Sequence, residues 1–200
     1  MCTNLSTPDK SPNQRQTIRR RILELVLFAL LGSLMFQSKI IMELIPNIHL
    51  LGMLTMCYTL LFRAKALFPI YVFVFLNGLY AGFALWWYPY LYIWTILWGI
   101  TMLLPRRMPR KVAFVVYPLV CGIHGLLFGI LYAPMQALMF GLNFKQMLAW
   151  IISGLTFDVI HGIGNFAAGF LILPLTDQLR KMMRREFRNQ ISISSDELQN

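Results

Sequence analysis

Long apolar runs alternate with short polar breaks along the chain. The runs cover residues 22–36, 48–62, 66–85, 91–104, 112–142 and 146–175. A helix needs about 20 apolar residues to cross the hydrocarbon core of a bilayer. The pattern therefore predicts an all-α integral membrane protein with six transmembrane helices. The fourth run is short, so we expect residues 88–90 to begin that helix.

The run at residues 112–142 is longer than a single span requires. Proline has no backbone N–H, and it disfavours a continuous helix. We therefore expect a break near Pro134 that leaves an ordered loop on the outer side.

Both ends of the chain are polar. Residues 1–17 are rich in Ser, Thr, Pro, Asn and Gln, a composition that cannot bury enough apolar surface to fold. We predict a disordered cytoplasmic tail at residues 1–17, a membrane domain at 18–185 and a cytoplasmic C-terminal tail at 186–200. The basic, partly amphipathic segment near the C-terminus is expected to lie on anionic lipid.

Composition supports the membrane class. Hydrophobic residues make up 58% of the chain, charged residues 13%, and the mean hydropathy is +0.60. A soluble domain of 200 residues does not have such a composition. The chain is therefore expected to be a multi-pass protein of a cell membrane.

The net charge of +10 indicates topology rather than a nucleic-acid partner, because the basic residues form short clusters between the apolar runs. If the N-terminus is inside, all 18 lysines and arginines except Lys39 and Lys145 fall on the inner side. Cytoplasmic segments are enriched in Lys and Arg. Both termini are therefore predicted to be cytoplasmic.

An acid, an imidazole and an amide lie inside the last apolar run. Asp158, His161 and Asn165 are spaced i, i+3 and i+7, so they share one face of a helix. Ionisable residues inside a membrane commonly mark functional sites. Polar side chains also hold transmembrane helices together by hydrogen bonds. Both interpretations remain open for these residues.

Other polar and aromatic residues are expected at similar depth or in the outer loops. Together they predict a pocket open to the outside, with an aromatic lid that would stack on a planar ligand. The additional candidate residues for substrate binding are Asn77, His124, Asn47, Trp86, Trp87 and Tyr88. The aromatic residues could equally form an interfacial belt.

The sequence lacks the common catalytic motifs. It contains no G-x-x-x-x-G-K-[ST] loop, no H-E-x-x-H and no G-x-S-x-G. Cys2, Cys57 and Cys121 have no paired spacing, so no disulfide framework or zinc site is indicated. We expect no enzymatic activity and no cofactor. If the protein transports a solute, the energy for transport must come from a partner protein or an ion gradient, because the chain has no ATP-binding motif.

Several segments resemble the substrate-binding S component of energy-coupling factor transporters, the prokaryotic vitamin-uptake relatives of ABC importers. The resemblance covers residues 18–185. It rests on the six predicted spans, the basic N-terminus and three segments: Leu44-Ile-Pro46-Asn47-Ile, Phe83-Ala-Leu-Trp86-Trp87 and Asp158-x-x-His161-x-x-x-Asn165.

The resemblance implies a membrane-embedded subunit that captures a water-soluble vitamin or related micronutrient. It also implies a transmembrane coupling subunit and two ATPase subunits as partners. In that family a small-residue Ala-x-x-x-Ala pattern on the first helix meets the coupling subunit. Here Ala29 and Ser33 match that pattern, with Ser in the second position.

Two other classes of protein remain as alternatives. His124 and His161 could be axial ligands of a haem in an electron-transfer membrane protein. Alternatively, the polar residues only hold helices together in a structural or regulatory membrane protein.

Overall fold

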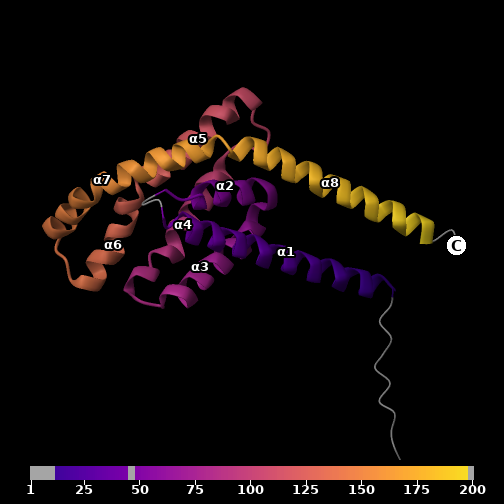
Figure 1. Cartoon of the computed structure of the whole chain (residues 1–200), viewed down its shortest axis with the longest axis horizontal. Coiled ribbons are helices and arrows are strands. Elements are labelled where there is room, and N and C mark those ends of the chain that lie inside the picture. Colours follow the sequence, from indigo (N-terminus) through magenta and orange to yellow (C-terminus); the bar gives the residue numbers. More distant parts are fainter. Residues whose placement is uncertain (1–11, 45–47, 198–200) are drawn as a thin grey trace, which may run out of the picture.

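The computed structural model describes residues 12–44 and 48–197, with side chains for 14–44 and 48–185. Within these ranges the chain forms helices and no strand, which confirms the all-α class (Figure 1). The elements are α1 (Pro12–Met42), α2 (Leu51–Phe62), η1 (Arg63–Ala66), α3 (Leu67–Ala81), η2 (Leu85–Trp87), α4 (Tyr90–Leu103), α5 (Arg110–Leu126), α6 (Phe128–Phe140), α7 (Phe144–Gly169) and α8 (Ile172–Glu197).

Within the described residues, four stretches are long and apolar enough to cross a membrane, in line with a multi-pass membrane protein. They are Gln14–Met42, Leu51–Ala81, Arg110–Phe140 and Phe144–Gly169. The second stretch contains two of the predicted spans. The run at residues 91–104 corresponds to α4, which begins at Tyr90 as expected.

The predicted N-terminal tail is shorter than expected. Helix α1 begins at Pro12, so residues 12–17 are helical rather than part of a disordered tail. Proline is well suited to the first helical position, because its fixed φ fits the helix and no N–H is needed there. Residues 1–11 lie outside the described residues, and so does Asn47.

Helices α1, α2 and α3 alternate in direction. Tyr58 donates to the Leu31 carbonyl at 3.2 Å, and Phe62 contacts Phe28, so α2 runs antiparallel to α1. Phe68 stacks on the same Phe28 at 5.8 Å, and Tyr80 contacts Phe36 at 5.6 Å, so α3 runs parallel to α1. The stretch Leu51–Ala81 therefore turns back on itself at η1, where Arg63 has a φ of 56°.

Helices α5 and α7 pack closely in opposite directions. A Cβ on Gly169 would lie 2.5 Å from Pro118 Cα, and a Cβ on Gly122 would lie 2.8 Å from Phe166 Cβ. Small residues allow the backbones of transmembrane helices to approach in this way. This packing brings the polar face of α7 against the junction of α5 and α6.

The fifth apolar run breaks at Leu127, not near Pro134 as expected. Leu127 is the C-cap of α5 and also the N-cap of α6, whereas Pro134 lies inside α6. A proline in a helix removes only one hydrogen bond of the ladder. The break at Leu127 is instead stabilised by a contact from α7, described below, that no local pattern reveals.

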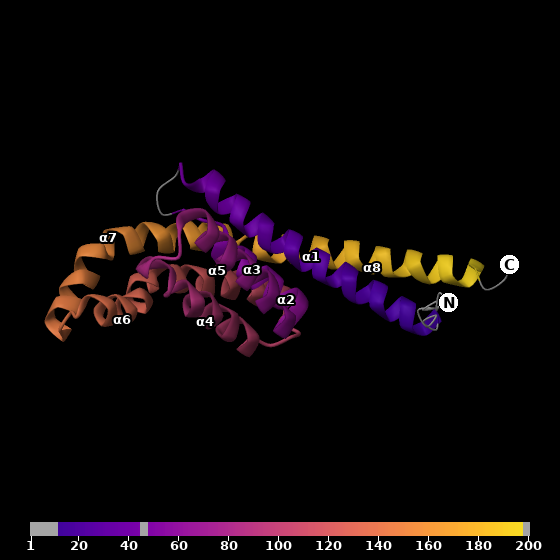
Figure 2. The ribbon, with the colours of Figure 1, turned by 90° about the horizontal axis from the view of Figure 1, so that it is seen from below.

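The sixth apolar run is also divided. Helix α7 begins with a capping box between Asn143 and Gln146 and ends at Gly169, and α8 follows from Ile172. Arg180 on α8 donates to the Leu60 carbonyl at 3.3 Å, which ties the start of α8 to the end of α2. Figures 1 and 2 show that α8 and the N-terminal part of α1 extend past the other helices on the same side.

Candidate functional site

The polar face of α7 points into the protein. Asp158 and His161 are each 7% exposed and Asn165 is 2% exposed. The residues on the opposite face, such as Val159 and Ile163, are exposed. The predicted common face of the three polar residues is therefore confirmed, and each must be explained as a buried polar group.

Asp158 caps helix α6. Its Oδ1 accepts a hydrogen bond from the Gly129 N–H at 3.0 Å. The N–H groups of a first helical turn have no partner within the helix, and Leu127 offers no side-chain cap. The carboxylate also lies favourably at the positive end of the helix dipole. Asp158 therefore stabilises the break at Leu127, which is a structural role.

His161 and Asn165 form a pair one turn apart. The Nδ2 atom of Asn165 lies 3.1 Å from Nε2 of His161. A Cβ on Gly52 would lie 3.1 Å from Asn165 Oδ1, and one on Gly125 would lie 2.5 Å from its Nδ2. The two glycines, on α2 and α5, thus make room for the Asn165 amide between the helices.

A cluster of rings surrounds Phe128 beside this pair. The ring centroid of Phe128 lies 5.1 Å from that of His161, 6.1 Å from Trp94 and 6.4 Å from Tyr90. We call the set of His49, Tyr90, Trp94, His124, Phe128, His161 and Asn165 the ring cluster. It joins α4, α5, α6 and α7 to the segment before α2.

His49 and His124 complete the ring cluster on two sides. The His49 ring lies 5.8 Å from that of His161, and the His124 ring lies 6.0 Å from that of Trp94. His124 Nε2 is 3.2 Å from the Ile93 carbonyl oxygen. Burial lowers the pKa of His49, which precedes the span Leu51–Ala81, to about 4, and the nearby His161 and Lys39 act in the same direction. His49 is therefore neutral near pH 7.

Four buried polar atoms of the ring cluster have no hydrogen-bond partner within the described part of the chain. They are His49 Nδ1, Trp94 Nε1, His124 Nδ1 and Asn165 Oδ1. Leaving a buried donor or acceptor without a partner costs about 1–3 kcal/mol, and native structures contain few such atoms. The other such atoms among the described residues lie on Thr55, Arg63, Asn77 and Thr176. The four in the ring cluster belong to residues that adjoin one group of rings, where an additional molecule would supply the missing partners.

Only some of the expected outer residues adjoin the ring cluster. The Trp86 ring contacts that of Tyr90 at 5.7 Å. Trp87 instead donates its indole N–H to the Val74 carbonyl at 2.8 Å, which fixes it against α3. Tyr88 is exposed. Trp87 was expected in the lid, but its hydrogen bond gives it an anchoring role between η2 and α3.

Asn77 is fully buried on α3, and neither its Oδ1 nor its Nδ2 has a hydrogen-bond partner in the part of the chain that the structure describes. Ala29 is exposed on α1 and Ser33 is half-buried. The Ser33 hydroxyl donates to the Ala29 carbonyl at 2.9 Å, so the small-residue face of α1 has its polar group satisfied.

The sequence did not single out Tyr90, Trp94 and Phe128, because each lies in an apolar run where a ring is expected for packing alone. The spacing of Tyr90 and Trp94, one turn apart, was the available signal. His49 is not among the candidates that the sequence indicates. Its contact with His161 depends on how the chain enters α2, which periodicity does not predict.

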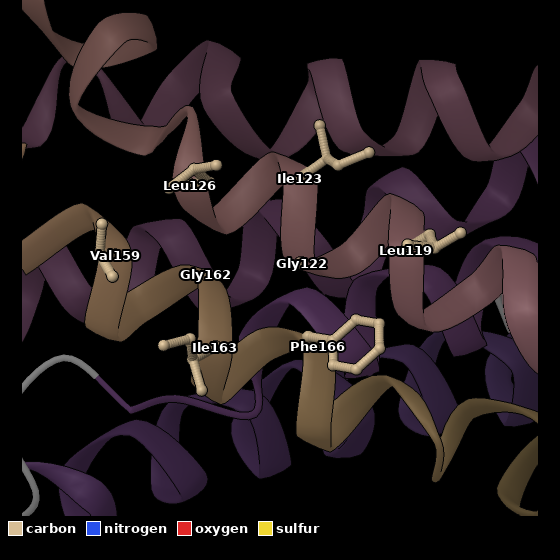
Figure 3. A pocket seen from close by; sticks show the side chains of 8 residues that line it. All are labelled: Leu119, Gly122, Ile123, Leu126, Val159, Gly162, Ile163 and Phe166. Carbon is tan, nitrogen blue, oxygen red and sulfur yellow. The ribbon is translucent and has the colours of Figure 1, made fainter.

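A separate apolar groove of about 440 Å³ lies between α5 and α7, on the face away from the polar residues (Figure 3). It is lined by Leu119, Gly122, Ile123, Leu126, Val159, Gly162, Ile163 and Phe166. These residues offer no side-chain hydrogen bond to a polar ligand. The groove is therefore distinct from the ring cluster.

The geometry does not favour a haem between His124 and His161, since Nε2 of each ring already lies within hydrogen-bond distance of Ile93 or Asn165. Among the described residues, no group of three His, Cys, Asp or Glu side chains could hold a metal ion. Comparisons with models of protein families, with curated proteins and with solved structures found no match.

Proposed function

We propose that this protein is a membrane-embedded substrate-binding subunit for uptake of a water-soluble vitamin or related micronutrient. The observation that carries the proposal is the set of four buried, unpartnered polar atoms around Phe128. Small-molecule sites are commonly built in this way, from apolar and aromatic walls with a few polar groups that orient the ligand.

The proposal includes six spans in a prokaryotic cell membrane with both termini in the cytoplasm. The reversal at η1 supports two spans within Leu51–Ala81. Lys65 forms an ion pair with Glu24, Arg110 lies 3.5 Å from Asp177, and Arg180 donates to the Leu60 carbonyl. Basic residues of three segments therefore lie at one end of the bundle, which we call the basic end. That distribution agrees with the enrichment of Lys and Arg on the cytoplasmic side.

Cysteine labelling in intact cells tests this topology. A cysteine in place of Lys145 should react with an impermeant reagent from outside, and one in place of Arg107 should react only after the membrane is opened. The reverse pattern would contradict the orientation.

Small molecules released from the purified protein test the binding function. Denaturation of the wild-type protein should release a compound that mass spectrometry detects. The Asn165→Ala variant should release much less of it, because the amide that orients the ligand is lost. Ile163→Ala changes the opposite face of α7 and serves as the matched control. Equal release from the wild type and Asn165→Ala would contradict the proposed site.

The absence of an ATP-binding motif in the sequence supports a division of labour with a coupling subunit and two ATPase subunits. In vesicles, the protein alone should bind substrate without accumulating it. Accumulation by this chain alone, without ATP or other subunits, would contradict the proposed partnership.

A structural membrane protein without a ligand remains a second candidate, because Asp158 has a structural role at the start of α6. The two functions differ in their expected response to Asn165→Ala. Loss of thermal stability without loss of any released compound would favour the structural candidate.

A further inference from the structure

The charges near the ring cluster are balanced within the protein. Lys39 pairs with Glu43 at 2.7 Å beside His49, and the Asp158 carboxylate faces the N-terminus of α6. Lys145 lies in the first turn of α7, about 20 Å along the helix from Asp158 at 1.5 Å per residue. A ligand with a negative charge would therefore find no unpaired cation among the described residues of the ring cluster.

The unpartnered atoms define what a ligand must offer. Asn165 Oδ1 accepts, so it needs a donor, and Trp94 Nε1 donates, so it needs an acceptor. His124 Nε2 donates to the Ile93 carbonyl, so Nδ1 of the neutral His124 ring accepts and needs a donor, whereas Nδ1 of His49 can take either role, depending on the tautomer. The rings of Phe128, Trp94 and Tyr90 provide flat apolar faces nearby.

We infer that the ring cluster selects an uncharged, flat heterocycle that carries both an N–H or O–H donor and a carbonyl or ring-nitrogen acceptor. This inference rests on the proposed binding function and narrows it to a substrate class. A heterocycle of this kind would satisfy Asn165 and Trp94 together while its ring packs against Phe128. A carboxylate or phosphate on the same ring would lose its hydration without gaining an ionic partner.

Matched pairs of compounds test the inference. We would titrate the wild-type protein in lipid nanodiscs with nicotinamide and nicotinate, with uracil and its carboxylate orotate, and with pyridoxine and pyridoxate. In any pair that binds, the uncharged member should bind at least about 100-fold more tightly, because a buried ion without a partner is strongly disfavoured. A carboxylate that binds as tightly as its uncharged partner would overturn the inference and leave the proposed function standing.

The compound released from the purified protein covers the case in which none of these six compounds binds. An uncharged heterocycle in the released fraction would support the inference, and a compound that is ionised at neutral pH would overturn it. If no compound is released and none of the six binds, the proposed function fails and the inference fails with it.

Two tryptophans one turn apart on α4 provide the variant test. Trp94→Phe removes the unpartnered N–H but keeps an aromatic ring, and should weaken binding of the tightest probe by roughly 5- to 150-fold. Trp98→Phe is the matched control, because its N–H donates to the Arg63 carbonyl at 3.1 Å, at the end of α2. Trp98→Phe should leave probe affinity unchanged. Unchanged affinity in Trp94→Phe would overturn the assignment of the donor.

Discussion

The ring cluster and the basic end of the bundle use the same kinds of residue for different purposes. At the basic end, Trp98 donates to the Arg63 carbonyl, and Arg63 donates in turn to the Met102 carbonyl at 2.8 Å. In the ring cluster, the N–H of Trp94 has no partner among the described residues. The Trp98 N–H and one N–H group of Arg63 thus join helices, although Nε of Arg63 also has no partner in the described part of the chain. The proposed function assigns the unpartnered atoms around Phe128 to a ligand.

The strongest test of this difference concerns His161 and Asn165. Asn165→Ala removes a proposed partner of the ligand, and His161→Ala removes the ring that holds the Asn165 amide in place. Each should weaken ligand binding by about 1–3 kcal/mol, or roughly 5- to 150-fold. Titration calorimetry on both variants would measure the effect. If both melt at lower temperature but bind as the wild type does, these residues belong with the helix-joining groups.

A smaller effect is expected for Asp158. Asp158→Ala removes the cap of α6 and should lower the free energy of unfolding by about 0.5–2 kcal/mol. Asp158→Asn keeps an oxygen that can accept from Gly129 and should lose less. Thermal melting of the two variants in the same lipid would compare them. Equal losses in both would show that the charge, not the hydrogen bond, supports the start of α6.

The pH dependence of stability sharpens the comparison further. The pKa of His49 is about 4 in the folded protein, below the ordinary histidine value of 6.5, so folding favours the neutral ring. The resulting stabilisation is complete above the unfolded pKa and is lost as pH falls from about 6.5 toward about 4. Melting temperatures across this range should decline less in His49→Gln. The same decline in the variant would assign it to other groups.

The smallest effects are expected in the apolar groove between α5 and α7. Ile163→Leu and Val159→Ile change exposed positions on the face away from the ring cluster. Each should change stability by no more than about 0.5 kcal/mol and leave ligand affinity unchanged. A clear loss of affinity in either variant would show that the two faces of α7 are coupled.

Periodicity was sufficient to predict the helical class and the common face of Asp158, His161 and Asn165, because both follow from 3.6 residues per turn. It could not predict the break at Leu127, since Pro134 is the stronger local signal and the cap comes from α7. The binding roles proposed for Trp94 and Phe128 could not be predicted from the sequence either. A ring in an apolar run looks the same whether it packs in a core or faces a ligand.

The position of Trp87 is a second feature that the local sequence could not predict. Three aromatic residues before a proline suggested a lid, but the indole N–H of Trp87 reaches a carbonyl of the preceding helix, over Gly78. Which ring of such a series is anchored depends on small residues across the helix interface. That information lies in tertiary packing and not in the local sequence.

The parallel packing of α1 on α3 also has a consequence for biosynthesis. Gly32 of α1 lies against Pro69 and Val72, so the main surface that covers α1 is made only after α2 and η1 have left the ribosome. At about 5–20 residues per second, the chain needs several seconds to proceed from the end of α1 to the end of α3. During that interval α1 must remain inserted on its own, surrounded by lipid or by the insertion machinery. The exposed apolar side chains along α1 are compatible with contact with lipid during that interval.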